Sequence, residues 1–165
     1  MIIRKAVPQD FEALRAIYNH EAVYTCNNFD THAIEPQEWI ARMSAYNKPD
    51  ENHPLLVAED DGVVCGYASL SRFRPKHGYT GSVELSIYVS RDHRGKGIGN
   101  KLMAAIVEEA QNDPRTHTIV SVVIPQNAAS MALHKKFNFE FCGCIREAAF
   151  KRGAYHDINY YQLIV

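Results

Sequence analysis

The chain has 165 residues, a formal net charge of −1 and a hydrophobic content of 46%. This length supports one well-filled core and leaves little room for a second, so we expect a single domain over residues 1–165. Neither Lys nor Arg forms a long block, which disfavours a nucleic acid partner. No apolar run approaches the roughly 20 residues of a membrane-spanning helix, so no membrane partner is expected.

The cysteine pattern predicts free thiols in a reducing cytoplasm. Cys26, Cys65, Cys142 and Cys144 include no C-x-x-C pair, and the first residues lack the hydrophobic stretch of a signal peptide. The histidines are scattered without metal-ligand spacing. We therefore favour packing roles for these side chains and expect no metal.

The first half of the chain predicts two helices and three strands. Apolar residues recur at helical spacing after Pro8 and again after Pro36, a residue type that suits the first turn of a helix. The pair Asp61-Gly62 favours a hairpin turn. The expected elements are a strand over 1–6, a helix over 8–19, a loop over 25–35, a helix from Pro36, and strands over 55–58 and 63–73.

The second half contains a clearly alternating strand, Val83 to Val89. Aliphatic residues occupy one face of this strand, and Glu84, Ser86 and Tyr88 occupy the other. A glycine loop follows, and then come a helix over 100–110, a strand over 118–124, a helix over 128–137 capped by Asn127, and strands over 139–151 and 154–165. This order predicts an α/β chain of the α+β type with seven strands and four helices.

The glycine loop, residues 94–99, reads Arg-Gly-Lys-Gly-Ile-Gly between a strand and a helix. Glycines at such a junction allow backbone N–H groups at the helix N-terminus to close around a phosphate. A G-x-x-x-x-G-K-[ST] loop would need Lys and then Ser or Thr after its last glycine, where this chain has Asn100 and Lys101. The spacing also differs from the G-x-G-x-x-G of dinucleotide-binding folds. The loop predicts a phosphorylated cofactor other than ATP or NAD.

Two motifs resemble the GCN5-related N-acetyltransferase (GNAT) family, and the element order extends this resemblance over nearly the whole chain. Arg94-x-x-Gly97-x-Gly99 is similar to the family's acyl-CoA pyrophosphate loop, and residues 127–139 are similar to its N-x-x-(A/S)-x-x-L-Y-x-x-x-G-F segment. Asn138 replaces the Gly, a mild change in a left-handed position, and His134 replaces the Tyr. The resemblance implies the GNAT fold, a central mixed, mostly antiparallel sheet flanked by helices, with acetyl-CoA as cofactor.

Five further segments resemble the GNAT group that acetylates phosphinothricin, methionine sulfoximine and methionine sulfone. The group implies direct acetyl transfer in a ternary complex to the amino group of a small amino-acid-like substrate, detoxification of amino-acid analogues, and a homodimer. His134 is usual there. Two alternatives stay open, a non-catalytic acyl-CoA-binding sensor domain and a protein or peptide N-acetyltransferase on the same fold. The segments are Ile17 to His20, Asn28 to Asp30, Phe73 to Tyr79, Val83 to Val89 and Phe150 to Asp157.

The chemistry of acetyl transfer requires a neutral amine. An α-amino group with a pKa of about 8 costs about 1.4 kcal/mol to deprotonate at pH 7, against roughly 4.6 kcal/mol for a lysine amine. One carboxylate base is adequate to deprotonate an α-amino group. Glu84 on the polar strand face is the candidate for this base, and the alternative is that Glu84 is only a solvated glutamate on a strand. The Val89 N–H is the candidate donor to the thioester oxygen. His134 is either a group that protonates or hydrogen-bonds the sulfur or a surface histidine.

The remaining candidates fall into two sets. Arg94 either adds positive charge for the pyrophosphate or belongs to a plain surface loop. Arg74 either pairs with a carboxylate of the substrate or is a solvated charge. Asn127 caps the helix, contacts the pantetheine, or does both. The cofactor set is Ile87, Tyr88, Val89, Arg94, Gly95, Lys96, Gly97, Ile98, Gly99, Asn100, Lys101 and Asn127. The acceptor set is Phe29, Arg72, Arg74, Pro75, Lys76, His77, Glu84, Leu85, Ser86 and Ile87.

Overall fold

The computed structural model describes residues 1–165 and contains the predicted seven strands and four helices. The helices are α1 (Phe11–Tyr24), α2 (Pro36–Met43), α3 (Ile98–Asn112) and α4 (Ala128–Lys136). The strands are β1 (Ile2–Lys5), β2 (Leu55–Asp60), β3 (Val63–Arg72), β4 (Ser82–Val89), β5 (Thr118–Val123), β6 (Glu140–Lys151) and β7 (Ala154–Ile164). Short 3₁₀ turns, η1 (Pro8–Asp10), η2 (His77–Tyr79) and η3 (Arg91–His93), precede α1, β4 and the glycine loop.

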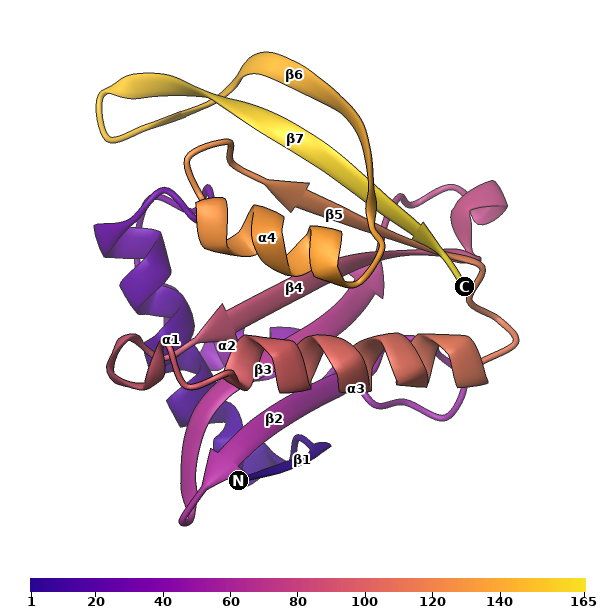
Figure 1. Ribbon diagram of the computed structural model, residues 1–165. Helices are drawn as coiled ribbons and strands as arrows, with labels where there is room; N and C mark the ends of the chain where they lie inside the picture. The colour runs from indigo at the N-terminus through magenta and orange to yellow at the C-terminus, as the bar shows by residue number, and fades with distance from the viewer.

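All seven strands form one sheet in the order β1-β2-β3-β4-β5-β7-β6, with α3 and α4 on one face and α1 and α2 on the other (Figure 1). Only β4 and β5 are parallel, and every other neighbouring pair is antiparallel. The predicted mixed, mostly antiparallel sheet is therefore confirmed. None of the helices combines the length and apolar composition that crossing a membrane would require.

The parallel pair β4 and β5 separates partway along its length. Pairing covers Ser82 to Leu85 on β4 and Thr118 to Ser121 on β5, and beyond these residues the two strands diverge (Figure 1). We call this opening the fork. It is bordered by the last four residues of β4 on one side and by the end of β5 and the start of α4 on the other.

Each face of the sheet has its own core. Val83 and Leu85 of β4 are buried against α3, as their alternation predicts. Tyr88 lies on the opposite face, but in an aromatic cluster rather than a polar surface, with its ring centroid 5.5 Å from Tyr18 and 5.3 Å from Tyr67. The strand face predicted for Tyr88 is therefore confirmed, but α1 covers this part of the face, so Tyr88 does not lie on an open polar surface.

Local backbone predictions hold where a residue type fixes the geometry. Asp61 and Gly62 both have positive φ, 49° and 79°, as the hairpin turn requires, and Asn138 has φ 61° after α4. Several boundaries differ from the prediction, and α3, for example, spans Ile98–Asn112 rather than residues 100–110. The first helix is preceded by a separate 3₁₀ turn, because the Asp10 carboxylate accepts from the Val7 N–H at 2.8 Å, and it continues to Tyr24.

Candidate functional site

The glycine loop leads directly into the N-terminus of α3. Gly95 and Gly97 have φ values of 77° and 76°, which favour glycine, and a Cβ at either position would meet no heavy atom within 4 Å. The space above the first turn of this 15-residue helix is therefore open, and its N–H groups are free for an anion. The geometry fits a pyrophosphate. The predicted cofactor residues gathered here are Arg94, Gly95, Lys96, Gly97, Ile98, Gly99, Asn100 and Lys101.

The edge of β4 that faces the fork pairs with no other strand beyond Leu85, and there the Val89 carbonyl accepts from Arg94 Nε at 3.4 Å. The Ser90 N–H donates to the Cys65 carbonyl of β3 at 2.8 Å. Backbone groups of successive residues in an antiparallel strand point to opposite sides, so Tyr88 also faces β3, whereas Ile87 and Val89 face the fork. The fork edge can therefore pair with an amide-bearing chain such as pantetheine through Ile87 and Val89. The backbone of Tyr88, which the sequence grouped with them, belongs to the β3 pairing.

Glu21, near the end of α1, organises the fork from the α1 face. It is 3% exposed and accepts hydrogen bonds from Thr25 Oγ1 at 2.8 Å, from Asn27 Nδ2 at 2.7 Å, and from the Arg94 guanidinium. Burial would raise the pKa of Glu21, but these hydrogen bonds and the charge of Arg94 outweigh it and hold the pKa below its usual value. In this structure Arg94 is thus anchored to α1.

The chain of contacts continues to the far side of the fork through Asn127. Its Oδ1 accepts from the Ser130 N–H at 3.0 Å, which confirms the predicted cap of α4, and its Nδ2 donates to Asn27 Oδ1 at 3.0 Å. Arg94, Glu21, Asn27 and Asn127 therefore form a continuous polar bridge between the two sides of the fork. We call these four residues the bridge.

Glu84 lies on the face of β4 opposite α3, next to where the fork begins. Burial raises the pKa of Glu84, and the positive charge of Arg74 opposes the rise only in part. No hydrogen bond stabilises its charged form. A half-buried carboxylate without a partner binds a proton readily, which is the property required of a general base that operates near neutral pH.

The predicted acceptor residues divide between the two faces of the sheet. Ser86 shares the Glu84 face by alternation, and Phe29 lies in the loop after α1 with its ring 6.3 Å from His156. Leu85 and Ile87 point into or against the α3 core, so their side chains are turned away. Arg72 pairs with Val83 in the sheet, so the Arg72 side chain leaves the strand on the same face as Val83, which is the face that packs on α3. Pro75, Lys76 and His77 are exposed around η2, and Arg74 lies over the Phe73 ring at 4.3 Å.

His134 is buried, at 4% exposure, so the surface alternative was wrong. Its Nδ1 lies 2.7 Å from the Ser130 carbonyl and its Nε2 lies 2.7 Å from Ser121 Oγ. The carbonyl requires a proton on Nδ1, which leaves Nε2 to accept from the Ser121 hydroxyl. Burial lowers the pKa of His134 and keeps it neutral. Both ring nitrogens are thus engaged within the protein, which does not favour a role in protonating a thiolate.

Sequence reasoning missed Glu21 and also Lys151. The Lys151 ammonium is buried and donates to the Asn28 carbonyl at 2.8 Å and to the Glu21 carbonyl at 3.3 Å, which fastens the hairpin β6–β7 to the loop after α1. Lys151 lies in the segment Phe150 to Asp157, which resembles the family, whereas Glu21 lies just beyond the segment Ile17 to His20, and no local pattern marked either side chain. The structure contains no group of three or more His, Cys, Asp or Glu side chains that could hold a metal ion.

Comparison with known families and proteins extends the similarity to the whole chain. A family model described as an acetyltransferase (GNAT) domain matches residues 3–160. The chain is 36% identical to the L-amino acid N-acyltransferase MnaT of Escherichia coli, over 99% of this chain and 93% of that protein. It is 34% identical to the L-methionine sulfoximine/L-methionine sulfone acetyltransferase of Salmonella typhimurium, over 99% and 94% of the two chains.

Two solved structures show the same architecture. The ribosomal-protein-alanine N-acetyltransferase from Brucella melitensis matches with a TM-score of 0.95 and 36% identity, over all of both chains. A phosphinothricin acetyltransferase from Sinorhizobium meliloti, solved in complex with AcCoA, matches with a TM-score of 0.92 and 30% identity, over 99% of this chain and 88% of that one. The open glycine loop and the fork therefore occur in a fold known to bind this cofactor.

Proposed function

This chain belongs to the GNAT acetyltransferase family and is an N-acetyltransferase that uses acetyl-CoA, and from this premise we propose that its acceptor is the α-amino group of a small amino-acid-like molecule. Methionine sulfoximine, methionine sulfone and phosphinothricin are the acceptor types we propose, and protection against such analogues is the role. The observation that carries the proposal is Glu84, a half-buried, unpartnered carboxylate at the start of the fork.

In the proposed mechanism transfer is direct, within a ternary complex. Glu84, directly or through a water molecule, takes the proton of the amine as its nitrogen bonds to the acetyl carbon and the carbon–sulfur bond breaks. Coenzyme A leaves as a thiolate. The Val89 N–H, which faces the fork, donates to the thioester oxygen as negative charge develops there. The glycine loop and the N-terminus of α3 hold the pyrophosphate.

The substrate class is tested by release of free thiol from acetyl-CoA across an acceptor panel. We expect turnover with methionine sulfone, methionine sulfoximine or phosphinothricin, and much less with peptides that carry a free N-terminus or a lysine. Efficient turnover of peptides alone would instead support the protein N-acetyltransferase alternative. Binding of coenzyme A without turnover of any amine would support the sensor alternative.

The cofactor loop is tested by Gly97→Glu. Residue 97 has a left-handed φ of 76°, which disfavours any residue with a side chain, and the new carboxylate places a negative charge at the N-terminus of α3. Binding of coenzyme A should therefore be lost. Titration calorimetry measures the affinity, and circular dichroism checks that the variant is folded. Unchanged affinity in a folded variant would contradict the assignment of the loop.

A homodimer in the cytoplasm completes the proposal. Phe141, Phe150 and Tyr155 on the hairpin β6–β7 are 57–65% exposed, which supports a second copy of the chain as their cover. Four free cysteines support a reducing compartment. Light scattering should give twice the 18.7 kDa of one chain, and a monomer at micromolar concentration would contradict the dimer.

A further inference from the structure

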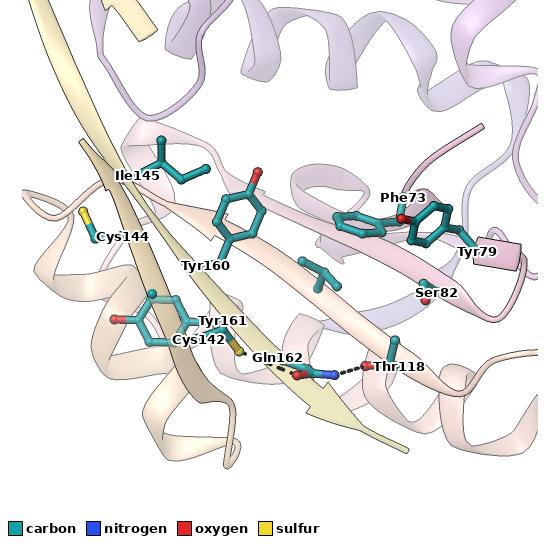
Figure 2. Close-up of a pocket in the computed structure, with 12 residues that line it drawn as sticks. Phe73, Tyr79, Ser82, Thr118, Cys142, Cys144, Ile145, Tyr160, Tyr161 and Gln162 are labelled. Atoms are coloured by element: carbon teal, nitrogen blue, oxygen red, sulfur yellow. Dashed lines mark hydrogen bonds between the residues drawn. The ribbon is translucent and has the colours of Figure 1, made fainter. Parts of the chain in front are cut away.

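A cavity of about 500 Å³ lies between the strands β4 to β7 and the segment around η2, and none of the residues that line it belongs to the predicted acceptor set (Figure 2). It is bounded by β4 and β5 below, by β6 and β7 on one side, and by Phe73 and Tyr79 on the other. A cavity of this size accommodates a small amino acid or its side chain.

The cavity begins directly beside Glu84. Glu84 pairs with Val120 across the β4–β5 ladder, and Ser82 pairs with Thr118 two residues earlier. Alternation places all four side chains on one face, and Val120, Ser82 and Thr118 line the cavity. Neighbouring strands lie about 4.8 Å apart, so an amine beside the Glu84 carboxylate can extend its side chain into the cavity.

The lining is aromatic, aliphatic or polar, but not charged. Phe73 and Tyr79 meet edge to face, with ring centroids 5.9 Å apart, and Tyr160 lies farther along the cavity (Figure 2). The polar floor is internally satisfied, since Gln162 Nε2 donates to Thr118 Oγ1 at 2.9 Å. No lining residue offers a cation to an anionic group, and an unpaired anion is costly to hold away from water.

The one cation whose charge acts on Glu84 is Arg74, at the edge of this region. A guanidinium that binds the α-carboxylate of the acceptor is not free to bind a second anion. The phenol hydroxyls of Tyr79 and Tyr160 can instead donate to neutral oxygens such as those of a sulfone.

We propose that this cavity receives the side chain of the acceptor and selects neutral, methionine-like side chains over anionic ones. The proposal rests on the proposed function, and it divides the acceptor types named there. Methionine sulfone and methionine sulfoximine bring a neutral side chain to the cavity, whereas phosphinothricin brings an anionic phosphinate and should be the poorer acceptor of the three.

The test compares kcat/KM for methionine sulfone, phosphinothricin, norleucine and alanine by thiol release. We expect the wild-type protein to prefer methionine sulfone over phosphinothricin by at least tenfold. Val120→Phe fills the cavity, so kcat/KM for methionine sulfone should fall about tenfold relative to kcat/KM for alanine, and alanine should still be acetylated. Tyr160→Phe should lower kcat/KM for methionine sulfone severalfold and leave kcat/KM for norleucine unchanged. Tyr24→Phe, on an exposed part of α1, is the matched control and should change neither value.

The outcomes separate the two proposals. Equal kcat/KM values for phosphinothricin and methionine sulfone would overturn the selection against anions. Acetylation of alanine with side-chain preferences unaffected by Val120→Phe would overturn the cavity assignment and leave the proposed function intact. Absence of turnover with every amino acid would overturn both.

Discussion

Two carboxylates flank the fork, and their surroundings are opposite. Glu21 accepts hydrogen bonds from Thr25, Asn27 and the Arg94 guanidinium, lies 3.3 Å from His20 Nδ1, and has a lowered pKa, whereas Glu84 has no hydrogen-bond donor and a raised pKa. The protein thus stabilises the ionised form of one glutamate and the protonated form of the other. A carboxylate whose oxygens all accept hydrogen bonds stabilises the fold, and a carboxylate without hydrogen-bond donors is available for proton transfer.

This comparison predicts its largest effect for Glu84→Gln. Loss of the base should lower kcat by about 10²–10⁴-fold. Stability should not fall, because a raised pKa means that ionised Glu84 disfavours the folded state at pH 7, and a neutral amide removes that cost. Thiol-release kinetics and thermal unfolding measure the two quantities. A variant that kept its activity would remove Glu84 from the mechanism.

Glu21→Gln should show the reverse pattern, with a loss of stability of about 2–3 kcal/mol, because charged hydrogen bonds to a buried carboxylate are replaced by neutral ones. Because the pKa of Glu21 is lowered on folding, ionised Glu21 stabilises the fold above pH 4.5, the usual glutamate pKa. The stability lost in the variant should therefore be full above pH 4.5 and should shrink as the pH falls below it. Glu12→Gln is the matched control, since the Glu12–Arg15 pair on the same helix is exposed and worth little. Urea unfolding at pH 7 and pH 4 tests both statements, and equal effects of the two variants would contradict the role of the bridge.

The sequence predicted Glu84 and missed Glu21 for a physical reason. The face of Glu84 follows from alternation within eight residues, just as the Asp61-Gly62 turn and the Asn127 cap follow from their own residue types. Glu21 and Arg94 are 73 positions apart, and only the assembled fold brings them together. Local rules give elements and caps, while partnerships across the sheet depend on how those elements pack.

The same limit applies to His134 and to the cavity. The position of His134 in α4 was predicted, but its burial depends on contact with Ser121 of β5. The cavity joins Phe73 and residues of η2, β4, β5, β6 and β7, and no short motif in the chain marks them as one site. The resemblance to a family predicted acceptor residues, among them Phe29, but none of the residues that line this cavity.

The pH dependence of kcat/KM is a smaller and more specific test of the Glu84 environment. Activity should fall about tenfold per pH unit below the pKa of Glu84, and this limb should lie above the usual glutamate value of 4.5. The charge of Arg74 lowers that pKa, so Arg74→Gln should move the limb to higher pH. Lys135→Gln, which removes an exposed charge from α4, should leave the limb in place. A limb unmoved by Arg74→Gln would show that the two groups do not interact.

The smallest effect concerns the far end of the bridge. Asn127→Ala should cost about 1 kcal/mol, because the cap of α4 is lost, whereas Asn127→Ser retains a capping oxygen and should restore most of it. The shorter serine cannot reproduce the amide contact with Asn27 or reach as far into the fork. If Asn127 also binds the pantetheine arm, Asn127→Ser will keep its stability and still show a severalfold higher KM for acetyl-CoA. Recovery of both quantities would reduce Asn127 to a helix cap, and the bridge would then be a structural element with no direct part in cofactor binding.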